Sequence, residues 1–150
     1  MPWVTDIHFT DIDGGKLGDY ELEEDLIYED VDGTLYKTLK GASSDLSSFP
    51  WFARVILPKS LLAKAPFPHD THYRTQKALV RTPEDQDFVS MPISREKSDR
   101  IYRNGAIDEG MNDKLAKGLY AGLRVGGWVT WNKHKRAIAK ALERRRKVGR

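Results

Sequence analysis

The side chains best suited to chemistry lie in one short segment, His69-Asp70-Thr71-His72-Tyr73-Arg74. Two prolines, at 66 and 68, come just before it. Proline is well placed at the start of a helix, because its missing N–H is not needed there. The sequence therefore predicts a helix from about His69 to Lys77. Residues three and four apart share a helix face, so the side chains of His69, His72 and Tyr73 would point the same way.

A second acid–base pair, Asp99-Arg100, follows a helix-start signal formed by Ser94 and an acid two residues later. A helix is predicted here over residues 95–107. If the two helices pack antiparallel, Asp99 would accept a hydrogen bond from His69 and fix the tautomer of its imidazole. His69 would then be a general base. The alternative is a His–Asp hydrogen bond that only stabilises the fold.

A cation site is the next hypothesis that these residues suggest. Asp70 and Asp45 carry carboxylates, the ligands that calcium prefers, so the two together are candidate ligands. A zinc site is weaker, because beyond His69 and His72 the chain has only two histidines, both far away in sequence. We therefore expect no cofactor, with calcium as the alternative, and we expect His72 to be a polar residue at the helix surface.

Residue types and motifs that the sequence lacks exclude several other kinds of active site. The chain has no cysteine, which excludes a disulfide scaffold, a thiolate zinc site and a cysteine nucleophile. Its glycine pairs lack the lysine and the spacing of a phosphate-binding loop, and no serine lies in a nucleophile elbow. No stretch of 18 apolar residues is present, and the first residues lack a basic region followed by an apolar run. We expect neither a transmembrane segment nor a signal peptide.

The first half of the chain is predicted to form the strands that support the two helices with His69 and Asp99. Apolar and acidic residues alternate from Tyr20 to Asp30, which predicts one half-buried strand. Asp32-Gly33 predicts a hairpin turn, with Thr34–Leu39 as the return strand. A polar loop is expected over residues 42–50. The residues expected to face the core are Tyr20, Leu22, Leu26 and Tyr28.

The second half is predicted to be mainly helical. Residues 80–93 carry two prolines and three acids and look like an exposed connection. Two further helices are expected, over residues 113–125 and 133–147, with a break near Trp128 and Trp131. The fold class is therefore α+β. The expected organisation is an N-terminal arm (1–19), one domain (20–131) and a basic C-terminal helix or tail (132–150).

Charge is distributed unevenly along the 150 residues, although the net charge is only +3. Residues 1–50 hold 12 Asp or Glu and 3 Lys or Arg, whereas residues 133–150 hold 9 Lys or Arg and one acid. Such a basic end suits an acidic partner surface or, less strongly, a nucleic acid. Opposite charges also allow head-to-tail pairing between copies. The candidate partner-binding residues are Arg136, Arg144, Arg145 and Arg146.

Four motifs occur in the order of a known family. They are an acidic strand (residues 24–30), the loop Ser44-Asp45-Leu46-Ser47-Ser48-Phe49-Pro50, the segment His69–Arg74 and the segment Ser94–Tyr102. Together they resemble the domain-of-unknown-function family 1353, which occurs mostly in tailed phages and prophages. The resemblance implies a phage origin and no specific activity. Its motif residues here are Asp45, His69, Asp70, Tyr73, Arg74, Asp99 and Arg100.

A shorter resemblance concerns only the two helices. Secreted calcium-dependent phospholipases also carry a His-Asp-x-x-Tyr segment on one helix and Asp-Arg on another. By that resemblance His69 would be the general base, Asp70 would bind calcium and Asp99 would orient the histidine, with Tyr73 in support. The disulfides and the glycine-rich calcium loop of those enzymes are absent here.

Three functions follow as hypotheses. The first is a structural protein of a tailed-phage virion, in the tail, baseplate or neck, made in the host cytoplasm and present in several copies beside other virion proteins. The second is a small calcium-dependent ester or lipid hydrolase. The third is nucleic-acid contact through the basic C-terminus.

Overall fold

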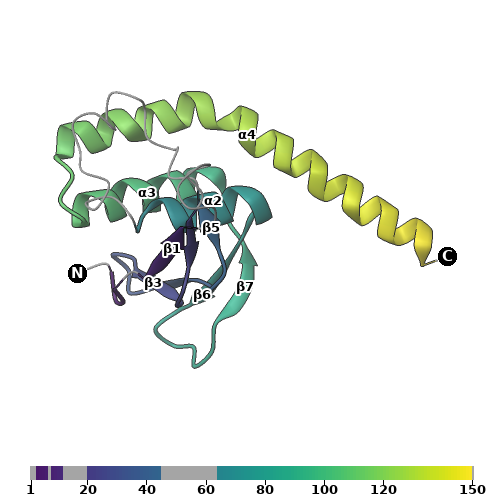
Figure 1. The fold of residues 1–150 in the computed structure, drawn as a ribbon, viewed down its shortest axis with the longest axis horizontal. Helices are drawn as coiled ribbons and strands as arrows, with labels where there is room; N and C mark the ends of the chain where they lie inside the picture. The colour runs from purple at the N-terminus through teal and green to yellow at the C-terminus, as the bar shows by residue number, and fades with distance from the viewer. Residues whose placement is uncertain (1–2, 7, 12–19, 45–63, 150) are drawn as a thin grey trace.

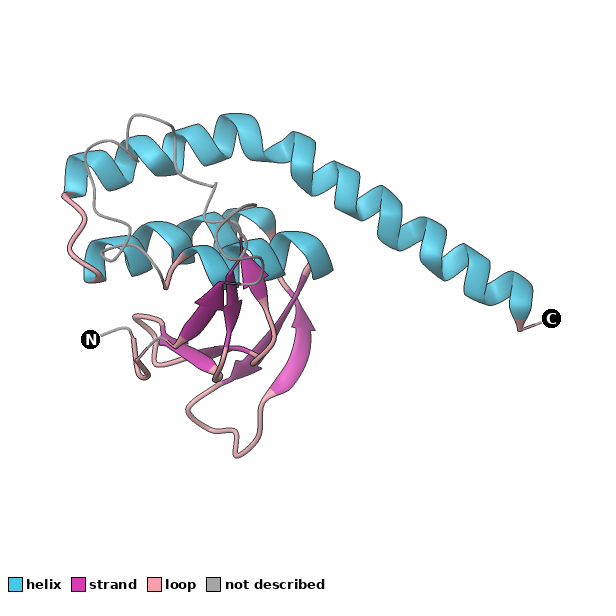
Figure 2. Ribbon diagram, in the orientation of Figure 1, coloured by secondary structure: helices cyan, strands magenta, loops and turns pink. Residues whose placement is uncertain are grey.

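The computed structural model describes residues 3–6, 8–11, 20–44 and 64–149, and it has the predicted α+β architecture. Two small antiparallel sheets lie on one side of α2 (Pro66–Thr75) and α3 (Arg95–Asp108), as Figures 1 and 2 show. The long helix α4 (Asp113–Val148) crosses on the other side of α2 and α3 and extends beyond them. The helices α2, α3 and α4 therefore meet above the sheets.

The strands form two sheets of different size. The smaller sheet has the order β1-β2-β5 and consists of β1 (Phe9–Asp11), β2 (Tyr20–Leu22) and β5 (Ser43–Ser44). The larger sheet has the order β3-β4-β6-β7 and consists of β3 (Leu26–Glu29), β4 (Leu35–Thr38), β6 (Lys77–Arg81) and β7 (Val89–Pro92). All described pairings are antiparallel.

The single strand predicted over Tyr20–Asp30 is wrong, because the chain forms β2 and β3 in different sheets. Three exposed acids, residues 23–25, separate the two strands. The predicted faces are confirmed: Leu22, Leu26 and Tyr28 are buried, whereas Glu21 is exposed. The predicted hairpin is also confirmed, since β3 pairs with β4 across a turn that ends at Gly33, where φ is +81°.

The exposed connection predicted over residues 80–93 is a second correction. This stretch instead holds the end of β6 and all of β7, which pair from Lys77↔Pro92 to Val80↔Val89. Its prolines suggested a loop, yet they are compatible with the structure. Pro83 lies in the hairpin connection, and Pro92 ends a strand at the sheet edge, where a missing N–H leaves no ladder bond unmade.

Several residues of the expected N-terminal arm pack on the domain. Residues 9–11 form β1, and the buried Trp3 donates its indole N–H to the carbonyl of Gly105, 3.0 Å away. A Cβ atom at Gly105 would lie 2.7 Å from the Trp3 ring. Glycine is therefore required in α3 at this point, because the indole lies directly against the helix backbone.

The predicted start of α3 is confirmed, since the Ser94 hydroxyl accepts the Lys97 backbone N–H at 3.1 Å. The two separate helices expected after residue 112 are wrong, because α4 is one helix of 36 residues. Figure 1 shows that α4 bends about midway and then projects past the rest of the molecule. Over the residues that the structure describes, no helix is long and apolar enough to span a bilayer.

Candidate functional site

The candidate site lies where α2, α3 and α4 meet. Proline at the first position of α2 fixes the start of that helix, so His69 and Tyr73 lie one turn apart on the face toward α3. Both side chains are buried, and Asp99 on α3 is completely buried. The predicted contact between the two motif helices is confirmed, because His69 Nε2 lies 2.9 Å from Asp99 Oδ1.

Four side chains surround the Asp99 carboxylate. Besides His69, Oδ1 accepts the Tyr73 hydroxyl at 2.6 Å. Oδ2 accepts Arg124 Nη1 of α4 at 3.0 Å and lies 3.5 Å from Arg95 Nη1 of α3. We call these five residues the Asp99 cluster. A buried carboxylate needs such partners, because an unpaired charge away from water is strongly unfavourable.

The charges of the Asp99 cluster determine its protonation. Burial disfavours the carboxylate of Asp99, but hydrogen bonds from His69, Tyr73 and Arg124 outweigh burial and lower its pKa. Burial also disfavours the charged imidazole of His69, yet the carboxylates of Asp70 and Asp99 outweigh it and raise the pKa of His69. The cluster therefore favours a charged Asp99 and a histidine that is protonated more readily than usual.

The second ring nitrogen of His69 has a different environment. Nδ1 is buried and makes no hydrogen bond within the described part of the chain. Its nearest charged neighbour is Asp70 Oδ1, 3.8 Å away, beyond hydrogen-bond reach. Asp70 in turn accepts the hydroxyl of Ser44 at 2.5 Å, so this carboxylate faces β5.

The guanidinium partners of Asp99 are Arg95 and Arg124, and neither was predicted from the sequence. Arg100, the neighbouring motif residue, is exposed. Arg95 lies four residues before Asp99, the spacing of a helical ion pair, so that partner was within reach of sequence reasoning. Arg124 comes from another helix, and no local pattern identifies it.

His72 is not a surface residue, which corrects another expectation. Its side chain is 2% exposed, and Nδ1 lies 3.4 Å from the hydroxyl of Ser98. Burial, followed by the nearby charge of His69, lowers the pKa of His72 to about 3. His72 is therefore a neutral core residue at neutral pH.

The remaining motif residues have other contacts. Arg74 donates to the backbone carbonyl of Ser43 at 2.7 Å and so connects α2 to β5. Asp45 lies outside the described residues. Within the described residues, no three His, Cys, Asp or Glu side chains lie close enough together to hold a metal ion. Calcium takes six to eight oxygen ligands, so a site at Asp70 remains a prediction that depends on Asp45.

The same helices also hold the backbone of α4. Arg95 donates to the carbonyls of Leu123 and Arg124 at 3.0 and 3.2 Å, and Gln76 donates to the carbonyl of Trp131 at 2.8 Å. The Trp131 ring meets the Tyr73 ring edge-on, with the centroids 5.1 Å apart. Residues 123–131 of α4 are therefore bound directly by side chains from α2 and α3. We call this stretch the α4 anchor.

Gly127 allows this close approach. A Cβ atom there would lie 2.4 Å from the Tyr73 hydroxyl, whereas a Cβ at Gly122 would meet nothing within 4 Å. We expect Gly127→Ala to lower the free energy of unfolding by about 1–3 kcal/mol, because the tyrosine must move away from Asp99. Gly122→Ala is the matched control and should raise it by about 0.5–1 kcal/mol, since alanine is the better helix former. Urea unfolding measures both. Equal effects would show that the α4 anchor is not tightly packed.

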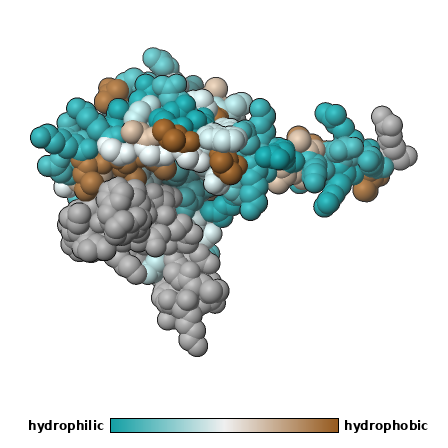
Figure 3. Space-filling view, turned by 90° about the horizontal axis from the view of Figure 1, so that it is seen from above, coloured by the Kyte–Doolittle hydropathy of each residue, from teal (hydrophilic) through white to brown (hydrophobic). Residues whose placement is uncertain are grey.

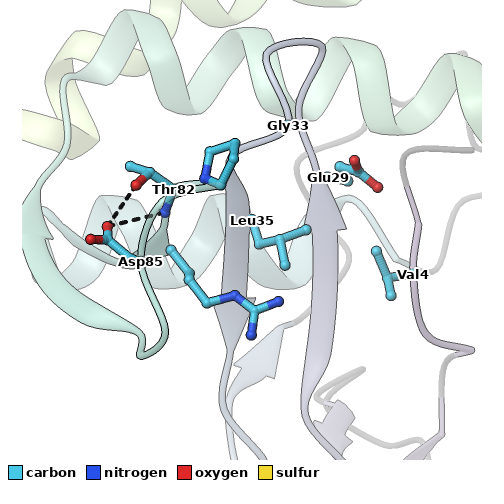
Figure 4. Close-up of a pocket in the computed structure, with 8 residues that line it drawn as sticks. Val4, Glu29, Gly33, Leu35, Thr82 and Asp85 are labelled. Atoms are coloured by element: carbon cyan, nitrogen blue, oxygen red, sulfur yellow. Dashed lines mark hydrogen bonds between the residues drawn. The ribbon is translucent and has the colours of Figure 1, made fainter.

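The described residues also form a pocket of about 250 Å³, which no residue of the Asp99 cluster lines. Figure 4 shows it near the β3–β4 turn, where Asp85 accepts hydrogen bonds from the backbone and side chain of Thr82. Its lining mixes charged and apolar side chains, namely Val4, Glu29, Gly33, Leu35, Arg81, Thr82, Pro83 and Asp85. None of the predicted site residues lines this pocket.

The candidate partner-binding arginines all lie on the projecting part of α4, and all are exposed. Helical spacing separates them into two groups. Arg136 and Arg144 lie on one face with three lysines, at spacings of three and four residues. Arg145 and Arg146 lie on other sides of the helix. We call the first group the basic stripe; it consists of Lys133, Arg136, Lys140, Arg144 and Lys147.

A comparison with family models gives one match. The model described as "Protein of unknown function (DUF1353)" matches residues 20–123. The matched region includes the Asp99 cluster except for the last residue, Arg124, and it ends inside the α4 anchor. No curated protein and no solved structure matches the chain.

Proposed function

The chain belongs to the DUF1353 family, and from this membership and the geometry above we propose that it is a structural protein that assembles with other copies or other proteins of a particle. The observation that carries the proposal is the α4 anchor. Side chains of α2 and α3 fix α4 just before it leaves the domain, so the Asp99 cluster serves to hold a projecting helix in one direction.

The projecting part of α4 has the surface of a binding element. Leu142 and Val148 are 51% and 87% exposed. Most helix stability in proteins comes from packing of an apolar face, and the exposed Leu142 and Val148 contribute little of it here. A partner that covers this part of α4 would supply that packing.

The particle that we propose is a tailed-phage virion, with the protein in the tail, baseplate or neck. Support comes from the four ordered motifs of residues 24–102, which resemble a family found mostly in tailed phages and prophages. Copies in such a particle stabilise one another by mass action, so a weak contact made by one helix is sufficient.

Removal of residues 133–150 tests the proposal. Because the α4 anchor ends at Trp131, we expect the truncated protein to keep a cooperative melt and to be lost from purified particles, as measured by mass spectrometry. Undiminished incorporation of the truncated protein would contradict an assembly role for the helix. Loss of the cooperative melt would show that residues 133–150 belong to the core.

A second candidate, a small ester or lipid hydrolase, is favoured by one specific observation. His69 Nδ1 has no hydrogen-bond partner in the described structure, while Nε2 is held by Asp99. In such an arrangement Nδ1 takes a proton from a water molecule, and the carboxylate stabilises the imidazolium that forms. Asp70 and Asp45 would hold the calcium ion, which would polarise the ester carbonyl. The burial of His69 favours the structural role as the first candidate.

A further inference from the structure

The basic stripe presents an unusual amount of unpaired charge. Its residues occupy 14 steps of the helix, which corresponds to about 21 Å of length. Lys133, Arg136, Lys140 and Arg144 are exposed and form no ion pair with any described residue, whereas Lys147 pairs with Glu143 at 3.3 Å. Figure 3 shows the hydrophilic surface that covers most of this part of α4. An acidic partner surface would complement such a row of cations.

The same chain presents an acidic surface elsewhere. Four exposed acids lie within five residues around the end of β2, namely Glu21, Glu23, Glu24 and Asp25. In the described structure only Asp25 has an ion-pair partner, Lys37 at 4.0 Å. We call these four residues the acidic surface. Among the described residues, the other three acids have no ion-pair partner.

The two charged surfaces do not meet within one molecule. The helix α4 packs on α3 and α2, and its basic end points away from both sheets, as Figure 1 shows. Two projecting helices would also not pair with each other, because each carries the same strong positive charge. A basic stripe on one copy and an acidic surface on the next copy remain as the complementary pair.

We infer that the basic stripe of one copy binds the acidic surface of a second copy, head to tail. The inference rests on the proposed assembly function and names the partner. A protein partner fits better than a nucleic acid, because the exposed Val148 lies one helical turn after Arg144, beside the basic stripe, and phosphates offer it nothing to pack against. A head-to-tail contact between identical copies generates a ring if the rotation closes and a filament if it does not.

Sedimentation of the full-length protein over a range of concentrations tests the inference. We expect wild type to self-associate at about 50 mM salt and to dissociate as salt approaches about 500 mM, because exposed charges are screened within about 10 Å at 0.1 M salt. The double substitution Lys140→Glu/Arg144→Glu should weaken association at least about tenfold, and Glu23→Lys/Glu24→Lys should do the same.

Two further samples make the test specific. Lys135→Glu/Arg146→Glu changes the charge equally on the opposite side of α4 and should associate like wild type. A one-to-one mixture of the two weakened variants should associate again, since each carries a surface that complements the other. Thermal melts establish that every variant is folded.

Several outcomes would overturn the inference. The inference is wrong if wild type stays monomeric at all concentrations, or if the charge reversals leave self-association unchanged. It is also wrong if the control variant weakens self-association as much as the charge reversals do, or if the mixture of the two weakened variants does not associate. A wild type that stays monomeric and binds a DNA duplex through the basic stripe would assign the stripe to nucleic acid. If charge reversal leaves self-association unchanged while truncation still removes the protein from particles, the head-to-tail contact between copies is wrong, but the proposed assembly function is supported.

Discussion

Replacement of Asp99 with alanine is expected to lower the free energy of unfolding by about 3–5 kcal/mol, the cost typical of breaking a buried ion pair by removing one partner. The carboxylate is completely buried and accepts from His69, Tyr73 and Arg124 at 2.6–3.0 Å. Without it, the guanidinium of Arg124 and the imidazole of His69 lose the acceptor that they share. Chemical denaturation with urea measures the change.

The neighbouring motif residue provides the control for this prediction. Arg100→Ala lies one position further along the same helix but on its exposed face, so its effect should stay within about 0.5 kcal/mol. Similar losses for both variants would mean that the cluster is not the main contact between α2, α3 and α4.

A milder variant at the same position separates the two candidate functions. Asp99→Asn keeps the shape of the side chain and should cost about 1–3 kcal/mol if the cluster is structural. If the site is catalytic, wild type should hydrolyse a chromogenic ester in the presence of calcium, and Asp99→Asn should lose that activity while its melt is nearly unchanged. The second outcome would overturn the preference for a structural role.

The stability of the protein is expected to fall by about 2 kcal/mol between about pH 6 and pH 4.5 because of His72 alone. Burial lowers the pKa of His72 to about 3, whereas the unfolded chain has an ordinary histidine pKa near 6.5. Between these two values the unfolded state binds a proton that the folded state does not, so stability decreases as the pH falls. The effect of His69 lies elsewhere: its raised pKa adds stability that is present below about pH 6.5 and lost as the pH rises through the folded value.

Urea unfolding at a series of pH values tests this prediction. His72→Gln removes the titrating group, so its stability should change less steeply with pH in this window than that of wild type. His134→Gln, on the projecting part of α4, should keep the wild-type slope. Identical slopes for wild type and His72→Gln would show that another group causes the acid sensitivity.

The pairing of His69 with Asp99 was predictable because both residues lie near clear helix starts. A proline before His69 and a capping serine before Asp99 fixed which face each helix presents. The faces of the hairpin were predictable for a similar reason, since alternation along a strand separates Leu26 and Tyr28 from the acids between and around them.

Other features depend on contacts that no local pattern records. The continuity of α4 through Gly126 and Gly127 depends on Arg95 and Tyr73, which lie on other helices. Glycine normally weakens a helix, so the sequence suggested a break. The strand β7 was missed because its prolines are typical of loops, and only the exposed edge of β6 provides its partner. Arg124 was missed because the face of α4 that packs inward is set by the whole three-helix junction.

The bend and the anchor of α4 have a mechanical consequence. From Gly127 to Val148 the helix rises over 21 residue steps, or about 32 Å, as an arm with its pivot at the contact with Tyr73. A rotation of about 10° at the pivot would displace the tip by about 5 Å, which is close to the pitch of one helical turn. A displacement of that size would place the side chains of one helical turn where those of the neighbouring turn should contact the partner. The packing around Gly127 therefore sets the angular tolerance with which the arm can reach a site on a neighbouring molecule.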